Sequence, residues 1–193
     1  MAPMPSSTTV MARLRPWVPP SVKRLYHRLL KHPYIMRRYG VDNSKLAEEL
    51  LYWDGRYRSD GGQFKAHFYE AFLLQIAGEH DASFVEGKVV ADFGCGPRGS
   101  LLWARRAAQR IGIDVLAPVY ARLFGTETQN MQYVASTEAS IPVTDASVDV
   151  LFCVNALDHT RDPVRMAAEM LRILTSSARS TCTCGRRSAS RLR

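Results

Sequence analysis

The chain has 193 residues, 46% of them hydrophobic, which is enough for one domain with a buried core and an additional segment. Eight of its 26 basic residues lie in 1–40 and five in 175–193, and neither of these segments contains an acidic residue. Residues 41–174 therefore contain the other 13 basic residues and all 18 acidic ones. The formal charge of +8 is therefore a property of the two ends and does not indicate a nucleic-acid-binding core.

Residues 1–20 are rich in Pro, Ser and Thr, and we expect them to be disordered. They contain no continuous apolar run of the length that a secretory signal needs, and no run in the chain approaches a transmembrane span. A cytoplasmic protein is the expectation.

Residues 21–80 are predicted to form an N-terminal helical segment. Its first helix follows two prolines, with Ser21 as the N-cap. One face of this helix is basic and consists of Lys23, Arg24, Arg28 and Lys31. Such a face either contacts an anionic surface, for example as a peripheral membrane contact, or is simply solvated, and the second alternative is preferred.

Two further helices are predicted at 43–57 and 63–78, and Gly78 is expected to end the second of them. The second helix has an apolar face at helical spacing, made of Phe64, Phe68, Phe72 and Leu73. We expect this aromatic stripe to pack in the core rather than to form a ligand-binding box.

From residue 88 the pattern changes to alternating strands and helices. The strands are predicted at 88–93, 110–114, 131–136 and 147–155, and the helices at 100–110, 117–125 and 162–174. The strands are short, β-branched and almost continuously apolar, as in parallel strands that are covered on both faces. Residues 81–174 are therefore predicted to form an α/β domain with a Rossmann-like doubly wound parallel sheet. Asp162 as N-cap and Pro163 in the first turn begin the last helix.

Four cysteines are present, at positions 95, 153, 182 and 184. None of them forms a C-x-x-C pair, and no histidine cluster completes a zinc site. The C-x-C of Cys182 and Cys184 can bind soft metals, but we expect it to be incidental and predict no metal site.

The stretch "KVVADFGCGPRGSLL", residues 88–102, combines a strand, an acid and three glycines. Gly94, Gly96 and Gly99 allow close approach of the backbone to a ligand, as in dinucleotide sites. Asp92 disfavours an NAD-dependent enzyme, because its carboxylate would repel the two phosphates. The same carboxylate suits a ligand with an ammonium group and no phosphate, such as S-adenosylmethionine. Asp114 lies 20 positions after Gly94, where an acid accepts hydrogen bonds from ribose hydroxyls.

Four blocks in this order resemble the class I S-adenosylmethionine-dependent methyltransferases, and the type 11 methyltransferase domain in particular. They are "VVADFGCGPRG", "IGID", "ASTEASIPVTDASVDVLFCVNALDHTRDP" and the helix that follows, over about residues 88–174. The resemblance implies transfer of a methyl group from S-adenosylmethionine to an acceptor by in-line displacement. It does not identify the acceptor or the atom that is methylated.

The resemblance also implies roles for individual residues. Those implied for the methionine part of the cofactor are Asp92, Phe93, Gly94, Cys95, Gly96 and Gly99. It places Asp114 at the ribose and Asn155 opposite the sulfonium and the acceptor. Either Thr137 or Glu138 lies near the adenine, since alignment of "IP" with the Leu-Pro of the family favours the first and the carboxylate favours the second.

Each role has a structural alternative. Asp92 can be a turn or helix cap, Asp114 a surface turn residue, and Asn155 an Asx turn that ends its strand. His159 is a candidate general base, because its ordinary pKa is near neutral, or a side chain that packs between the last strand and the last helix. A base is needed only if the acceptor must lose a proton, since alignment and desolvation supply most of the catalysis of a methyl transfer.

Members of the family continue with a Lys-Pro-Gly-Gly-like turn, a fifth strand and an antiparallel pair, in the sheet order 3-2-1-4-5-7-6. Here residues 175–193 are rich in Ser and Arg and have no strand pattern. We expect a disordered, aberrant tail after a truncation, with strands five to seven missing. Strand 147–155 would then be an exposed apolar edge, which predicts poor solubility and weak turnover. The alternative function is a non-catalytic, degenerate methyltransferase scaffold whose basic N-terminal arm binds an anionic partner.

Overall fold

The computed structural model describes residues 19–26, 29, 32–183 and 189–190. The chain divides into two compact units, with the boundary after Gly55. The expected disorder of 1–20 falls almost wholly outside the described residues, as do the basic side chains of the first helix. The anionic-surface hypothesis for that helix therefore stays a prediction.

The first unit is helical. Its helices are α2 (Pro20–Tyr26), α3 (His32–Tyr39) and α4 (Ser44–Ser59), the last of which extends past the boundary. Ser21 lies within the first turn of α2 and is not its N-cap; the helix begins at Pro20, whose fixed φ suits the first helical position. The N-terminus of α4 is capped by Asn43, whose Oδ1 accepts hydrogen bonds from the backbone N–H groups of residues 45 and 46 at 2.8 and 3.0 Å.

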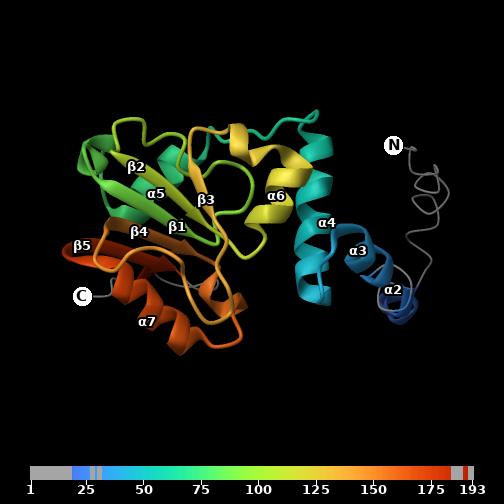
Figure 1. The fold of residues 1–193 in the computed structure, drawn as a ribbon. Helices are drawn as coiled ribbons and strands as arrows, with labels where there is room; N and C mark the ends of the chain where they lie inside the picture. Colours follow the sequence, from blue (N-terminus) through green and yellow to red (C-terminus); the bar gives the residue numbers. More distant parts are fainter. Residues whose placement is uncertain (1–18, 27–28, 30–31, 184–188, 191–193) are drawn as a thin grey trace. The chain divides into compact units, whose positions relative to one another are not determined.

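The second unit is built around one sheet with the order β3-β2-β1-β4-β5-β6 (Figure 1). Its strands are β1 (Val89–Phe93), β2 (Gln109–Ile113), β3 (Gln132–Val134), β4 (Val148–Val154), β5 (Leu174–Thr183) and β6 (Ala189–Ser190). The first five strands are parallel and β6 is antiparallel to β5. This arrangement confirms the predicted Rossmann-like parallel sheet.

Helices cover both faces of this sheet. The helices of the second unit are α5 (Tyr69–Ala77), α6 (Ala117–Phe124) and α7 (Pro163–Ile173). On one face, Met166 and Met170 of α7 pack against the strands; on the other face, Leu73 of α5 packs against Val90 and Phe152. Figure 1 shows α5 and α7 on opposite sides of the sheet. Alternate strand residues are therefore buried on each face, which explains the continuously apolar strand sequences.

The helix predicted at 100–110 is absent. Residues 100–106 form successive turns, in which the N–H of Leu102 bonds to Gly99 O at 3.1 Å and that of Ala104 bonds to Leu101 O at 3.0 Å. An α-helix over 100–108 would rise about 14 Å, less than the about 17 Å of the five-residue strand that it must retrace. The turns still bury the apolar side chains of Leu101 and Ala104 against the sheet.

The expectation of a strandless tail is wrong for residues 174–183. They form β5, which pairs with β4 from Val148↔Leu174 to Val154↔Thr183, with an irregularity after the first pair. The apolar strand β4 therefore has neighbours on both sides, and the premise of the expected aggregation is removed. The hydrogen bonds of a strand come from the backbone, so this segment can pair with β4 although its side chains are mostly small and polar, such as Ser and Thr, and show no apolar pattern. Positions 184–188 and 191–193 lie outside the described residues.

The predicted helix at 63–78 is shorter than expected and begins at Tyr69. Phe64 lies in the preceding loop, where its ring packs against Tyr57 and Phe124 with centroids 5.1 and 5.2 Å apart. Phe68 and Phe72 are 41% and 38% exposed, so the aromatic stripe is not a core face. The end at Gly78 is confirmed: it has a φ of 69° and donates to the carbonyls of the last turn.

Helix α7 is fixed to the loop that precedes β4. Asp162 caps its N-terminus as predicted, accepting a hydrogen bond from Arg165 N at 2.9 Å. Near its other end, Glu169 accepts from Ile141 N at 2.9 Å, and Arg172 donates to the carbonyls of Ile141 and Val143. The hydrogen bond from Arg172 also lowers the pKa of Glu169 to about 2.

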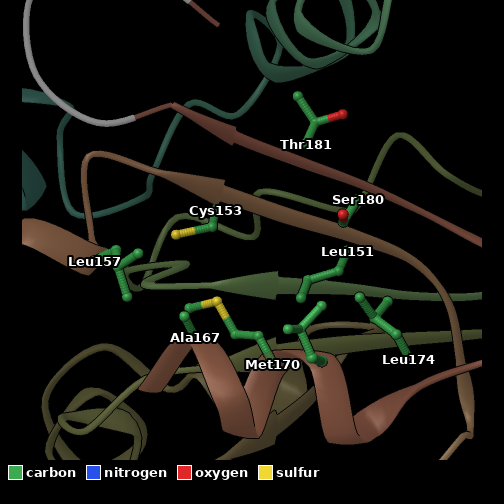
Figure 2. Close-up of a pocket in the computed structure, with 9 residues that line it drawn as sticks. Leu151, Cys153, Leu157, Ala167, Met170, Leu174, Ser180 and Thr181 are labelled. Atoms are coloured by element: carbon green, nitrogen blue, oxygen red, sulfur yellow. The ribbon is translucent and has the colours of Figure 1, made fainter. Parts of the chain in front are cut away.

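A cavity of about 90 Å³ lies between α7 and the strands β4 and β5. Figure 2 shows Ala167 and Met170 of α7 directed toward Leu151 and Cys153 of β4. Ser180 of β5 is the register partner of Leu151 and so faces the same helix. The small polar side chain at this position leaves apolar neighbours without packing partners.

We expect Ser180→Val to stabilise the chain by about 0.5–1.5 kcal/mol, because it fills part of the cavity and adds a β-branched residue to a strand. Urea unfolding measures the change. Ser177→Val, at an exposed position of the same strand, is the control for strand propensity alone. Equal stabilisation by both variants would contradict the role of the cavity.

Candidate functional site

The candidate site lies where the carboxyl ends of β1, β2 and β4 meet. The connections from β1 lead to β2 on one side, and β4 lies on the other, so the strand order reverses at this point. Ligands of doubly wound sheets bind at such a reversal. The loop Gly94–Gly99 leaves β1 there, beside Asp114 after β2 and Asn155 after β4.

Asp92 is buried on β1, with 6% of its surface exposed. Its Oδ2 accepts a hydrogen bond from Ser100 Oγ at 2.5 Å. Burial and, to a smaller extent, the negative charge of Asp114 together raise its pKa to about 7, against the opposing effect of the Ser100 hydrogen bond. The chain forms turns and no helix directly after the loop, so Asp92 does not cap a helix here, and a buried carboxyl of this kind suits a cationic partner.

The glycines of the loop permit a conformation that other residues disfavour. Gly94, Gly96 and Gly99 have φ angles of 73°, 59° and 74°. A Cβ at Gly94 would lie 2.2 Å from Cβ of Ala156. The loop after β1 therefore passes closely over the chain that leaves β4, and glycine is required at this crossing.

Asp114 binds directly to the glycine loop. Its Oδ2 accepts from Gly96 N at 3.0 Å and its Oδ1 accepts from Leu116 N at 2.9 Å. Two residues predicted to bind one ligand, 18 positions apart, are thus brought together.

Two side chains that sequence reasoning missed hold the same loop. Tyr133 on β3 accepts from Gly99 N at 3.2 Å through its hydroxyl and donates to Gln129 Oε1 at 3.0 Å, while Gln129 Nε2 donates to Pro97 O at 3.0 Å. Burial raises the pKa of Tyr133 well above its ordinary value, so the hydroxyl stays neutral. Nothing in the local sequence distinguishes these residues from an ordinary strand and turn.

The residues predicted near an adenine have local partners. Thr137 Oγ1 accepts from the N–H groups of Ala139 and Ser140 at 3.2 and 3.0 Å, which closes a turn. Glu138 accepts from Arg161 N at 3.2 Å and lies 3.7 Å from the guanidinium of the same residue. The segment after β3 is therefore bonded to the loop after β4, and the choice between Thr137 and Glu138 stays open.

Asn155 follows β4 in a left-handed conformation, with a φ of 50°. Asn adopts this conformation more readily than most residues, and the side chain is exposed at the end of the strand. This position is consistent with both the ligand-facing role and the strand-ending turn that the sequence left open.

His159 lies on the short helix Leu157–His159 after β4. Its side chain is 57% exposed, and its Nε2 lies 3.9 Å from Asp158 Oδ1. His159 therefore does not pack between the last strand and the last helix, which was the structural alternative to a role as general base. A catalytic role stays a prediction.

Cys95 is buried beneath the loop, and burial raises the pKa of its thiol. Its inclusion among the ligand-binding residues therefore concerns its backbone, since the thiol faces the core. Among the described residues, no group of three or more His, Cys, Asp or Glu is placed to hold a metal ion. The side chains of Cys182 and Cys184 lie outside them.

Comparison with known proteins gives one family match and several relatives. A family model described as a methyltransferase domain matches residues 91–180. A ubiquinone biosynthesis O-methyltransferase of Hahella chejuensis is 32% identical over 147 residues, which is 72% of this chain and 60% of that protein. An uncharacterized methyltransferase of a Mycobacterium species is 32% identical over 88 residues, or 45% of this chain and 34% of that protein. The chain thus spans 60% or less of the curated relatives it matches.

A solved structure of similar fold is the complex between the Haloferax volcanii Trm112 methyltransferase activator and a methyltransferase. It matches with a TM-score of 0.53 and 22% identity, over 69% of this chain and 58% of that one. This similarity concerns the fold alone. In the described part of the chain, no helix has the length and apolar character needed to cross a membrane.

Proposed function

We propose that the chain, as a member of the class I S-adenosylmethionine-dependent methyltransferases, transfers a methyl group from that cofactor to an acceptor by in-line displacement. The chain spans only part of its curated relatives, so the activity of the protein and its acceptor are not inherited from them. The proposal rests on the residues of the site.

The donor set fits S-adenosylmethionine better than a dinucleotide. Asp92 and Asp114 place two carboxyl groups beside the glycine loop, where a dinucleotide would bring two phosphates. The basic residue of the loop, Arg98, is paired with Asp60 at 2.6 Å and is 94% buried. The loop therefore offers acidic groups and backbone N–H groups to a ligand, a combination that suits an ammonium group and ribose hydroxyls.

Each residue has a role in this proposal. Asp92 and the loop Phe93–Gly99 hold the amino-acid end of the ligand, and Asp114 holds the ribose. Asn155 lies at the end of β4, where the acceptor would approach. Bound S-adenosylmethionine supplies a methyl group on a sulfonium centre, which is an activated leaving group. The contribution of the protein is alignment and exclusion of water.

His159 is proposed as a general base for an acceptor whose hydroxyl must lose a proton. Its exposure at the carboxyl edge of the sheet supports this role. His159→Ala is expected to reduce the rate of methylation of a hydroxyl acceptor about 10²-fold or more without a change in cofactor affinity.

The observation that carries the proposal is the contact between Gly96 N and Asp114 Oδ2 beside buried Asp92. Isothermal titration calorimetry with S-adenosylmethionine tests it on the wild type and on Asp114→Ala. Micromolar binding by the wild type and loss of at least tenfold in affinity in the variant are expected. Asp81→Ala, which removes the cap of a distant turn, is the control.

Absence of binding by the wild type, together with salt-sensitive binding to anionic vesicles or nucleic acid, would favour the scaffold hypothesis instead. In that case the basic N-terminal arm would carry the function. A cytoplasmic location and a membrane contact through this arm stay predictions.

A further inference from the structure

Arg98 is an unusual residue for a glycine loop that is expected to bind a ligand, because its charge is directed into the protein. It lies between Gly96 and Gly99, and only 6% of its surface is exposed. Its Nη2 donates to Asp60 Oδ2 at 2.6 Å. Its Cζ lies 5.9 Å from the ring centroid of Phe64 and 5.6 Å from that of Phe68, so aromatic faces cover the cation.

Asp60 belongs to a segment that precedes α5. Burial alone would raise the pKa of Asp60, but the hydrogen bond and charge of Arg98 and the N–H of Lys65 lower it below its ordinary value. The carboxylate is therefore ionised near neutral pH. A buried ion pair adds little net stability, since the cost of desolvation offsets much of the attraction.

The segment 60–68 is attached at both sides of the proposed cofactor site. Through Asp60 it contacts the glycine loop, and through Phe64 it contacts Phe124 of α6, the helix that follows Asp114. Gly61 and Gly62, with φ angles of 80° and 83°, have open space where a Cβ would lie. Their N–H groups donate to the carbonyls of Arg58 and Tyr57 at 3.1 and 2.9 Å, so the two glycines form the turn by which the chain leaves α4.

The glycine loop is also bonded by Asp114, Tyr133 and Gln129. Arg98 supplies the contact on the side of segment 60–68. The loop is thereby held by contacts with several separate segments before any ligand binds. Such preorganisation lowers the cost of binding, because fewer groups must be ordered.

We propose that Asp60 and Arg98 form a positioning pair, which holds segment 60–68 against the glycine loop and sets the loop for the cofactor. This inference rests on the proposed function. Neither residue contacts the reacting atoms. Their effect is on the conformation of Gly96–Gly99 and so on cofactor affinity.

The experiment compares Asp60→Asn, which keeps the shape and removes the charge, with two controls. Glu86→Gln makes the matched change in the exposed pair that Glu86 forms with Arg106 at 3.0 Å. Met170→Ala, at a buried core position on α7, lowers Tm and controls for general destabilisation. Two properties are measured well below Tm: affinity for S-adenosylmethionine by calorimetry, and hydrogen exchange of the Gly96 and Gly99 amides in the ligand-free protein.

The positioning pair predicts about tenfold weaker binding and at least tenfold faster exchange of both amides in Asp60→Asn, with both controls within twofold of the wild type. Arg98→Lys, which keeps a cation, is expected to show an affinity and exchange rates between those of the wild type and those of Asp60→Asn. Unchanged affinity and exchange in Asp60→Asn, or equal losses in Met170→Ala, would overturn the inference. If the wild type binds no cofactor, the proposed function fails, and the exchange measurement alone decides the inference.

Discussion

Asp92→Asn is expected to make the chain more stable at pH 8 while it abolishes binding of S-adenosylmethionine. The amide keeps the shape of the carboxyl and still accepts the hydrogen bond of Ser100, but it cannot become a buried anion. A gain of up to about 4 kcal/mol follows from a pKa that rises from 3.8 to about 7 at about 1.4 kcal/mol for each unit. Affinity is expected to fall at least 100-fold, because the ammonium group loses its counter-charge.

The pH dependence has a definite sign. Folded Asp92 binds its proton more tightly than the unfolded chain does, so its contribution to stability is full below about pH 4 and is lost as pH rises to about 7. Asp92→Asn removes this slope. The affinity of the wild type for the cofactor should rise between pH 6 and 8, because a larger fraction of Asp92 is then already ionised before the cofactor binds.

Urea unfolding at pH 5 and pH 8, with calorimetry at the same two pH values, measures both effects. Asp149→Asn is the matched control: Asp149 on β4 accepts a hydrogen bond from Val89 N at 3.0 Å and lies at the opposite end of the strands. If Asp92→Asn were destabilised at pH 8, or still bound the cofactor, the assignment of Asp92 would be wrong.

Gly94→Ala is expected to prevent cofactor binding and to lower the free energy of unfolding by about 2–5 kcal/mol. A left-handed backbone costs a residue with a Cβ about 1–2 kcal/mol, and overpacking adds about 1–3 kcal/mol. The new methyl group would meet Cβ of Ala156 at 2.2 Å. The chain after β4, including neighbouring Asn155, would have to move away from the site.

Gly87→Ala separates the two costs, because Gly87 also has a positive φ of 69° but has nothing within 4 Å of an added Cβ. It should lose about 1–2 kcal/mol and bind the cofactor normally. The double variant Gly94→Ala with Ala156→Gly removes the clash and should recover part of the stability and affinity. A double variant no better than Gly94→Ala would show that this contact is not the cause.

The sheet and the position of the site could be predicted from sequence because parallel strands and glycine loops have local signatures. Three features of the sequence predicted them: the apolar runs, Asp92 before the glycines, and Asp114 twenty positions after Gly94. Each belongs to a segment whose geometry depends little on the rest of the chain. The contact between Asp114 and Gly96 follows from the pairing of β1 with β2.

Features that depend on distance between segments could not be predicted. The sequence over 100–110 has apolar residues at helical spacing. Yet the chain must run back along the whole length of β1 before β2 begins, and the connection has too few residues to do so as a helix and a turn. The strand β5 has no apolar pattern, and its pairing with β4 is made by the backbone. Tyr133 and Arg98 reach the glycine loop through tertiary contacts, and neither has a local signal.

Equilibrium dialysis of the wild-type chain against S-adenosylmethionine and against NADH, at equal concentrations and pH 7.5, is the most direct test of the central claim. The claim is that two carboxyl groups beside a glycine loop select a phosphate-free cofactor. Micromolar retention of S-adenosylmethionine, displaced by S-adenosylhomocysteine, with no retention of NADH, is the predicted result. Retention of NADH and not of S-adenosylmethionine would contradict the claim.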